Sequence, residues 1–436
     1  MPGRTGPPTA APASPRRTDA VAAIFLGAAI FASWTAIDPL SLDSFDAPKA
    51  ILVATALSLA AAAALGSRVL RAGAARPRVS LPGLLFLAGL AGSALSSIAS
   101  ARRGVSLGAL RLVLLFLLAL PLGASEAYRR HRGRLVAVLV GAAVLNAVLI
   151  VLRALGLWSP LLVYGYSDRS GLGALVGNAG YAGIALALAA VTLLPFLFRA
   201  GRPRPLPVAA MAACVAGLLV TRSLSAVAVV AGGAAIYASL TGGRRGRVAL
   251  GAGAVLLAAA ALLYPPMRGR LTGVARAVRR GQWNAAFTAR AAPWLAAAEM
   301  IRAHPAAGIG IGNFGAEYVP ARIAAETRIR RRLVLDGMPT NSFAQAHNDY
   351  LDLFAGAGIP AGLCVVAAGA ILLAGLVRRG RADPDAAAAA ALLGGSAIAA
   401  FAWFPFQIVP TALWILLETG RADRMPSEHA PRANGM

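Results

Sequence analysis

The chain has 436 residues, of which 58% are hydrophobic and only 14% charged. Soluble domains average about 45–50% apolar and about 25% charged residues, so the composition excludes an ordinary soluble fold. The formal net charge of +25 does not indicate nucleic-acid binding, because most of it falls in short loops between apolar runs. Cys214 and Cys364 lie inside apolar runs, and the four histidines are far apart, so no disulfide framework or metal site is predicted.

Apolar runs of about 18 residues or more recur along the chain, which predicts an all-α polytopic membrane protein with about twelve transmembrane helices. We expect a disordered cytoplasmic N-terminus (1–19), helices 1–9 (20–265), a long loop (266–347), helices 10–12 (348–418) and a cytoplasmic tail (419–436). The expected spans are 20–37, 50–65, 81–98, 105–124, 134–156, 175–198, 205–221, 223–241, 248–265, 353–377, 385–403 and 405–418. The last two are short and interrupted near Phe404, and also fit one broken pair.

Alternate loops differ in arginine content, which predicts the orientation in the membrane. Arginine-rich loops include those around Arg68, Arg130, Arg202, Arg245 and Arg379, whereas the first loop of the other set is acidic. The positive-inside rule therefore places both termini in the cytoplasm and the long loop, 266–347, outside. Long loops cross the membrane largely regardless of their charge, so the arginines of the long loop do not alter this prediction.

The segment His347-Asn348-Asp349-Tyr350-Leu351 lies where the long polar loop returns to apolar sequence, and it is the best candidate for chemistry. Histidine has an unperturbed pKa of about 6.5, so His347 is suited to accept a proton near neutral pH. Asn348 or Asp349 could equally serve only as the cap of a helix that enters the bilayer. The sequence around this segment leaves both interpretations open.

Arginines and amides elsewhere extend the candidate site. Arg290 precedes a helix expected over 293–303, and the N-terminus of a helix favours an anion. Arg222 occupies a tight turn between two apolar runs, where an ionisable residue indicates function, although snorkelling to headgroups is the alternative. Arg169 and Asn178 flank the sixth span, and Asn178 also fits a helix cap.

The motifs occur in a recognisable order: Thr221-Arg222-Ser223, Arg290-x3-Trp294, Pro305-x2-Gly308-Ile309-Gly310-Ile311-Gly312-Asn313-Phe314 and His347-Asn348-x-Tyr350-Leu351. This order resembles the O-antigen ligase and polymerase superfamily of bacterial envelope glycosyltransferases. The sequence departs from the family pattern at Ala179-Gly180, at Thr221, and at Gly356, where a glutamate is common. Asp349 and Asp352 are the possible substitutes for that carboxylate.

The resemblance implies an enzyme of the bacterial inner membrane with its site facing the periplasm or the cell exterior. The donor would be an undecaprenyl-diphosphate-linked glycan, and the acceptor a hydroxyl of a glycan, the lipid A core or another molecule. No cofactor, metal or nucleic acid is implied, and membrane lipids are the surroundings. His347 would be the base, and Arg290 and Arg222 would stabilise the leaving diphosphate. Substrate contacts are expected from six residues: Asn348, Asp349, Tyr350, Arg169, Asn178 and Asn313.

A second class of function, a transporter or flippase for a lipid-linked or anionic substrate, also fits a polytopic chain. Transporters usually carry ionisable or helix-breaking residues near the middle of the membrane and often show internal repeats. The polar residues of this chain instead gather at one end of the spans, and no convincing repeat is present. The sequence therefore favours the glycosyltransferase.

Overall fold

The computed structural model describes residues 15–41, 43–70, 79–158, 172–198, 204–241, 243, 251, 253, 258–287, 289–333 and 343–423. Within these ranges the regular elements are helices and no strand occurs, so the predicted all-α membrane fold is confirmed. Nine helices of the described chain are long and apolar enough to cross a membrane. The prediction of twelve spans is therefore not confirmed.

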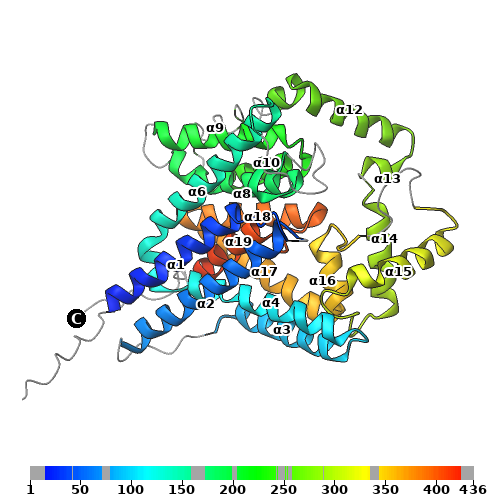
Figure 1. The fold of residues 1–436 in the computed structure, drawn as a ribbon, viewed down its shortest axis with the longest axis horizontal. Coiled ribbons are helices and arrows are strands. Elements are labelled where there is room, and N and C mark those ends of the chain that lie inside the picture. The colour runs from blue at the N-terminus through cyan, green and yellow to red at the C-terminus, as the bar shows by residue number, and fades with distance from the viewer. Residues whose placement is uncertain are drawn as a thin grey trace, which may run out of the picture.

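The bundle is formed by helices that precede and follow the long loop (Figure 1). Those before it are α1 (Pro15–Thr35), α2 (Asp46–Leu70), α3 (Leu81–Ala99), α4 (Arg103–Leu117), α5 (Ala119–Gly123), α6 (Glu126–Ala154), the short η1 (Ala174–Val176), α8 (Ala179–Phe198), α9 (Pro205–Val220) and α10 (Leu224–Thr241). Those after it are α16 (Asp349–Ala357), α17 (Ile359–Arg379), α18 (Pro384–Ala402) and α19 (Val409–Asp423).

Local sequence signals explain several helix starts. Ser80 and Ser125 accept hydrogen bonds from the backbone N–H groups of Gly83 and Tyr128, and thereby cap α3 and α6. Asp383 caps α18 through the N–H of Asp385, and a proline follows the cap as the first helical residue. These side chains satisfy N–H groups that have no partner within their own helix.

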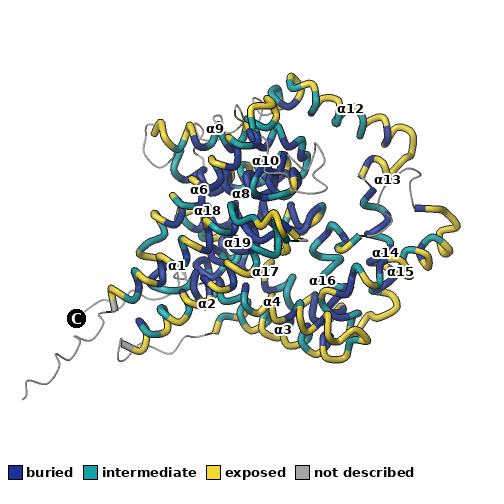
Figure 2. Tube along the Cα trace, in the orientation of Figure 1, coloured by how far each residue is buried: buried dark blue, intermediate teal, exposed yellow. Residues whose placement is uncertain are grey.

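Helices α8, α18 and α19 form the centre of the bundle, as the concentration of buried residues in Figure 2 shows. In the stretch of α8 that is long enough to cross a membrane, 83% of the residues are buried. A helix that is hydrophobic all round is typical of such a central position. The outer helices α2, α3 and α4 instead expose large side chains such as Leu59, Leu84, Leu87 and Leu114. Exposed leucines on a bundle of this length fit contact with lipid.

Several predicted segments differ from the observed helices. Helix α1 begins at Pro15, inside the segment expected to be disordered. The span predicted over 353–377 is two helices, because Gly358, with φ of +83°, ends α16 and the N–H of Ile359 bonds to the carbonyl of Pro305. The span predicted over 205–221 agrees with the 16-residue α9, and of the span predicted over 248–265 the structure describes residues 251, 253 and 258–265.

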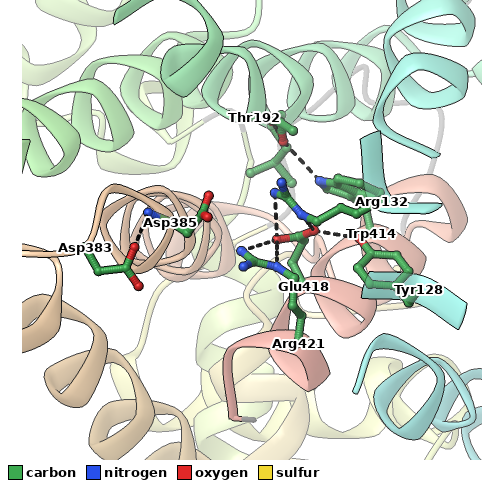
Figure 3. A network of polar contacts seen from close by, with 9 residues as sticks. Tyr128, Arg132, Thr192, Asp383, Asp385, Trp414, Glu418 and Arg421 are labelled. Atoms are coloured by element: carbon green, nitrogen blue, oxygen red, sulfur yellow. Dashed lines mark hydrogen bonds and ion pairs between the residues drawn. The ribbon is translucent and has the colours of Figure 1, made fainter. Parts of the chain in front are cut away.

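The last predicted span, 405–418, is wrong at both ends, because α19 runs from Val409 to Asp423 and includes charged residues. Figure 3 shows how these charges are buried: the Glu418 carboxylate lies 2.8 Å from Arg132 Nε and 2.7 Å from Arg421 Nη2, and accepts a bond from the Tyr128 hydroxyl. Buried charges are tolerated when they are paired and hydrogen-bonded in this way. An apolar-run criterion ends the helix too early because it cannot recognise that Glu418 and Arg421 are partners.

The long loop folds into helices beside the bundle (Figure 1). They are α12 (Pro265–Arg279), α13 (Trp283–Ala286), α14 (Ala291–Ala303) and α15 (Phe314–Ile329), which confirms the predicted partly helical loop. Helix α14 begins two residues before the predicted start, and Pro293 lies in its first turn. Helices α14, α15 and α16 share a small core that contains Met300, Phe314 and Tyr318.

The orientation of this loop gives the first testable prediction. Gln282 is exposed between α12 and α13, so a Gln282→Cys variant without the two native cysteines should react with a membrane-impermeant thiol reagent in intact cells. An outer membrane, where present, is permeabilised first. A cysteine at Ala382, in the arginine-rich turn between α17 and α18, is the control that should react only after lysis. The reverse labelling pattern would overturn the predicted orientation.

Candidate functional site

His347 lies at the junction of the long loop and α16, surrounded by aromatic rings. Its ring centroid is 4.9 Å from that of Phe404, 5.4 Å from Phe343 and 5.6 Å from Trp403. Its Nδ1 atom is 3.2 Å from the carbonyl oxygen of Gln345. Because a carbonyl only accepts hydrogen bonds, Nδ1 carries the proton, and Nε2 of the neutral ring keeps its lone pair.

Three causes act on the basicity of His347. Burial has the largest effect and lowers the pKa of the imidazole. The hydrogen bond to the Gln345 carbonyl raises the pKa, and the positive charge of Arg290 lowers it. Together the three causes give a pKa of about 4. His347 is therefore neutral across the physiological pH range, with Nε2 free to accept a proton. A bound anion beside Arg290 would offset that positive charge and raise the pKa, which would make His347 a stronger base when substrate is present.

Arg290 occupies the N-terminal cap position of α14, as the sequence predicts. Its guanidinium carbon is 4.8 Å from the centre of the Trp403 ring, in a cation–π contact. Arg290 and His347 therefore lie against the same indole ring, although they are separated by most of the long loop in sequence. A cation and an unprotonated imidazole nitrogen are thus brought to one place.

Helix α8 forms the wall behind Trp403. A Cβ atom on Gly180 would lie 2.3 Å from the indole, so only glycine allows this approach. The ring of Tyr181 meets Trp403 and Phe404 edge-on, at 5.8 and 5.4 Å between centroids. The site thus rests on the most buried helix of the bundle.

Arg222 reaches the same helix from the α9–α10 turn. A Cβ atom on Gly183 would lie 2.8 Å from atoms of both Thr221 and Ser223, so this turn packs on α8 one helical turn beyond Gly180. The Nε atom of Arg222 is buried and has no hydrogen-bond partner among the described residues. A buried guanidinium N–H without a partner is costly, which fits a group that binds an anion.

Backbone strain gathers at these positions. The described non-glycine residues with positive φ are five in number, and they include Arg222 at +57°, His347 at +55° and Ala289, next to Arg290, at +63°. A left-handed conformation costs a residue other than glycine about 1–2 kcal/mol. Such strain is often stored where side chains must be held in a particular direction for function.

The residues that follow His347 make contacts within the protein. Asn348 accepts the N–H of Leu351 as the cap of α16 and donates to the carbonyl of Phe401. Asp349 accepts from the N–H of Phe406 and from Gln407 Nε2, and the Tyr350 hydroxyl donates to the carbonyl of Ala397. The geometry supports the capping alternative for Asn348, and substrate contacts from these three residues stay a prediction.

Asp349 and Asp352 are a carboxyl pair on one face of α16. Gln407 Nε2 donates to both, at 2.9 Å and 3.1 Å, and the N–H of Ala346 donates to both oxygens of Asp352. Burial raises the pKa of Asp349 to about 7 despite its hydrogen bonds, and raises that of Asp352 to about 6. The amide donors are too weak to offset the desolvation of two carboxylates.

Asn178 and Asn313, two other predicted substrate contacts, form hydrogen bonds within the protein. A third, Arg169, lies outside the described residues. Asn178 is exposed and caps α8 through the N–H of Gly180. The buried Asn313 donates to Ser100 Oγ at 2.7 Å and to the carbonyl of Ile309, which fixes the long loop on the α3–α4 turn. Arg169 belongs to the segment that the structure does not describe.

The glycine run at 308–312 forms a tight turn, with positive φ at Gly308, Gly310 and Gly312. The N–H groups of Ile309 and Gly310 bond to the carbonyls of Ala355 and Gly356, and the Ile309 carbonyl accepts from Ser100. A Cβ atom on Gly310 would lie 2.6 Å from Ser106 Oγ. These N–H groups are therefore already occupied and do not form a phosphate cradle.

The sequence alone did not predict a role for the corner between α18 and α19. Trp403 and Phe404 complete the surroundings of His347, and Gln407 bridges the carboxyl pair. The signal was the aromatic and polar interruption Trp403-Phe404-Pro405-Phe406-Gln407 between two apolar runs, which indicated only a break between spans.

The comparison with known families bears on the same residues. Residues 209–366 match the family described as O-Antigen ligase. No curated protein matches the chain. The matched segment contains Arg222, Arg290 and His347, and it ends before the α18–α19 corner. Over this segment, the chain is similar to the O-antigen ligase family, which supports the resemblance to the O-antigen ligase and polymerase superfamily.

Proposed function

We propose that this protein transfers a glycan from a polyprenyl-diphosphate donor, typically undecaprenyl diphosphate, to a hydroxyl acceptor at the outer face of the bacterial cytoplasmic membrane. The observation that carries the proposal is that the imidazole of His347 and the guanidinium of Arg290 lie against one indole ring. The family match supports a role in the synthesis of surface polysaccharide.

In the proposed reaction, the acceptor hydroxyl oxygen attacks the anomeric carbon of the donor sugar. Its proton passes to Nε2 of His347, while the bond between the anomeric carbon and the bridging phosphate oxygen breaks. The bonding electrons leave with the lipid diphosphate, on which negative charge develops. One direct displacement of this kind inverts the configuration at the anomeric carbon.

The two arginines suit the leaving group. A guanidinium can donate two parallel N–H bonds to phosphate oxygens, which gives both charge and geometry. Arg290 has its position fixed by Trp403, and Arg222 has a buried Nε without a partner in the described chain. These groups would stabilise the charge that develops on the diphosphate, as fixed donors do in other enzymes.

The lowered pKa of His347 predicts that kcat/KM falls only at an unusually low pH. The neutral imidazole is the active form, so a pKa of about 4 keeps the base active at pH values where an ordinary histidine is protonated. We expect kcat/KM to change little between pH 6.5 and pH 5, measured with purified enzyme. Asp349 and Asp352 titrate in or near the same window, so the Asp349→Asn/Asp352→Asn double variant is the control. A loss of activity centred near pH 6.5 in both proteins would contradict the proposed state of His347.

Deletion of the gene tests the biological role and separates the two possible acceptors. Surface glycans are examined on gels from the deletion strain, with and without the wild-type gene supplied in trans. Polymer that accumulates without attachment identifies a ligase, whereas single attached repeat units identify a polymerase. Surface glycans identical to those of the parent strain would contradict the proposed role.

A further inference from the structure

The α18–α19 corner, residues 401–408, is attached to the N-terminus of α16 by a group of polar contacts. The N–H of Asp349 bonds to the carbonyl of Trp403, and the N–H of Phe406 bonds back to the Asp349 carboxylate. Gln407 Nε2 adds its bonds to Asp349 and Asp352, and Asn348 holds the carbonyl of Phe401. The corner is therefore fixed to the same helix start that follows His347.

Trp403 has little freedom within this corner. Its backbone is extended, with φ of −150°, and it ends α18. Gly180 lies directly behind the ring, Tyr181 meets its edge, and the side chain is only 8% exposed. The ring also contacts Phe404, the cation Arg290 and the imidazole of His347. The indole thus links two groups of the long loop that are far apart in sequence.

We propose that Trp403 is a positioning residue for the transfer reaction: it sets Arg290 and His347 relative to each other and excludes water from the imidazole, while Gln407 holds the corner on α16. This inference rests on the proposed glycosyl transfer. It assigns a role to a segment beyond the matched residues 209–366. A misplacement of about 1 Å can cost about 100-fold in rate, so a residue that touches no reacting atom can still have a large effect.

Two consequences follow for the site without the indole. Water would reach His347, so the pKa of its imidazole would rise from about 4 toward the ordinary value of about 6.5. Arg290 would lose its cation–π contact, which is one of the interactions that place its guanidinium. Both changes should lower turnover more than they weaken donor binding, because the parts of the donor that bind far from Trp403 keep their contacts.

The experiment compares purified wild-type protein with Trp403→Ala, Trp403→Phe and Gln407→Leu. We expect Trp403→Ala to lower kcat by about 100-fold with a small change in the donor KM, and Gln407→Leu to lower it by about 10-fold. Trp403→Phe keeps an aromatic face and should retain most of the activity. Trp283→Ala is the matched control, because Trp283 is half exposed on α13 and its ring stacks on Phe287, not on Trp403.

A second readout follows His347 directly and does not need turnover. Diethyl pyrocarbonate modifies neutral imidazole, so its reaction rate with His347 is measured against pH in a background in which His131, His304 and His429 are replaced by Gln. The wild-type rate should stay level between pH 7 and pH 5, once the intrinsic pH dependence of the reagent is subtracted. In Trp403→Ala it should fall with a midpoint shifted toward pH 6.5.

The outcomes separate this inference from the proposed function. If the wild-type protein transfers glycan and folded Trp403→Ala matches it in kcat and in the modification profile, the positioning role is wrong while the proposed function stands. If Trp403→Ala does not fold, Gln407→Leu decides: a wild-type kcat together with a wild-type modification profile in this variant overturns the inference. A wild-type protein that performs no transfer overturns the proposed function, and the positioning role with it.

Discussion

Replacement of His347 by alanine should lower the turnover of the purified enzyme by about 10²–10⁴-fold, the range that a positioned general base contributes. The Nδ1–H of the imidazole is committed to the carbonyl of Gln345, so Nε2 is the atom that can take the proton of the acceptor hydroxyl. The variant should still insert into the membrane, because the side chain is only one of several aromatic groups in a small cluster. It should also bind the lipid-linked donor, since the arginines remain.

Transfer and donor binding are measured in parallel in nanodiscs. His304→Ala is the control, because His304 is exposed at the end of α14 in the same loop. A His347→Ala variant that turns over at nearly the wild-type rate would remove His347 as the base. Asp349 would then be the next candidate, since its pKa of about 7 suits a proton acceptor near neutral pH. Loss of donor binding together with activity would instead indicate a structural role for His347.

Replacement of Arg290 by lysine should lower turnover by about 10²–10³-fold, by analogy with the loss of one donor to a developing oxyanion, which costs about 2.7–4 kcal/mol. Lysine keeps the positive charge, but it has neither the planar group that stacks on Trp403 nor the two-pronged donor geometry. The measurement is kcat with saturating donor, so that weaker donor binding alone does not mimic the effect.

Arg302→Lys is the matched control for this variant. Arg302 lies on the same helix and is exposed, with its guanidinium on Glu299. An exposed ion pair contributes little, so the control should keep wild-type turnover. If Arg290→Lys also keeps it, the guanidinium of Arg290 does not stabilise the leaving diphosphate, and Arg222 alone is left in that role.

The sequence predicted the membrane class because apolar runs of sufficient length are a direct consequence of the bilayer thickness. It misplaced the final helix because Glu418 and Arg421 are tolerated only through partners on α6 and within α19, which no local pattern reveals. It also joined α16 to α17, because nothing in the apolar content around Gly358 indicates that the chain is pinned there to Pro305.

The candidate site was predictable where its residues form motifs within the long loop. His347, Arg290 and Arg222 each stand out as polar groups in places that favour chemistry, and the structure brings His347 and Arg290 onto one ring. Trp403 was not predictable, because its partners are 56 and 113 positions away in the numbering and an aromatic residue between spans has many ordinary explanations. The role of Asn348, in contrast, was predictable from the local sequence, because the structure shows it as the helix cap that the sequence offered as one of two interpretations.

The most direct test of the account is transfer by the purified wild-type protein in nanodiscs, with a polyprenyl-diphosphate-linked glycan as donor and a hydroxyl-bearing glycan or lipid A core as acceptor. Mass spectrometry follows the glycosylated acceptor and the released polyprenyl diphosphate, in buffer that contains EDTA. The account predicts that the two products appear in equal amounts, and that His347→Ala forms neither. Donor that crosses the bilayer intact, with no new glycosidic bond, would contradict glycosyl transfer and favour a flippase. A reaction that EDTA stops and magnesium restores would contradict charge stabilisation by the arginines alone.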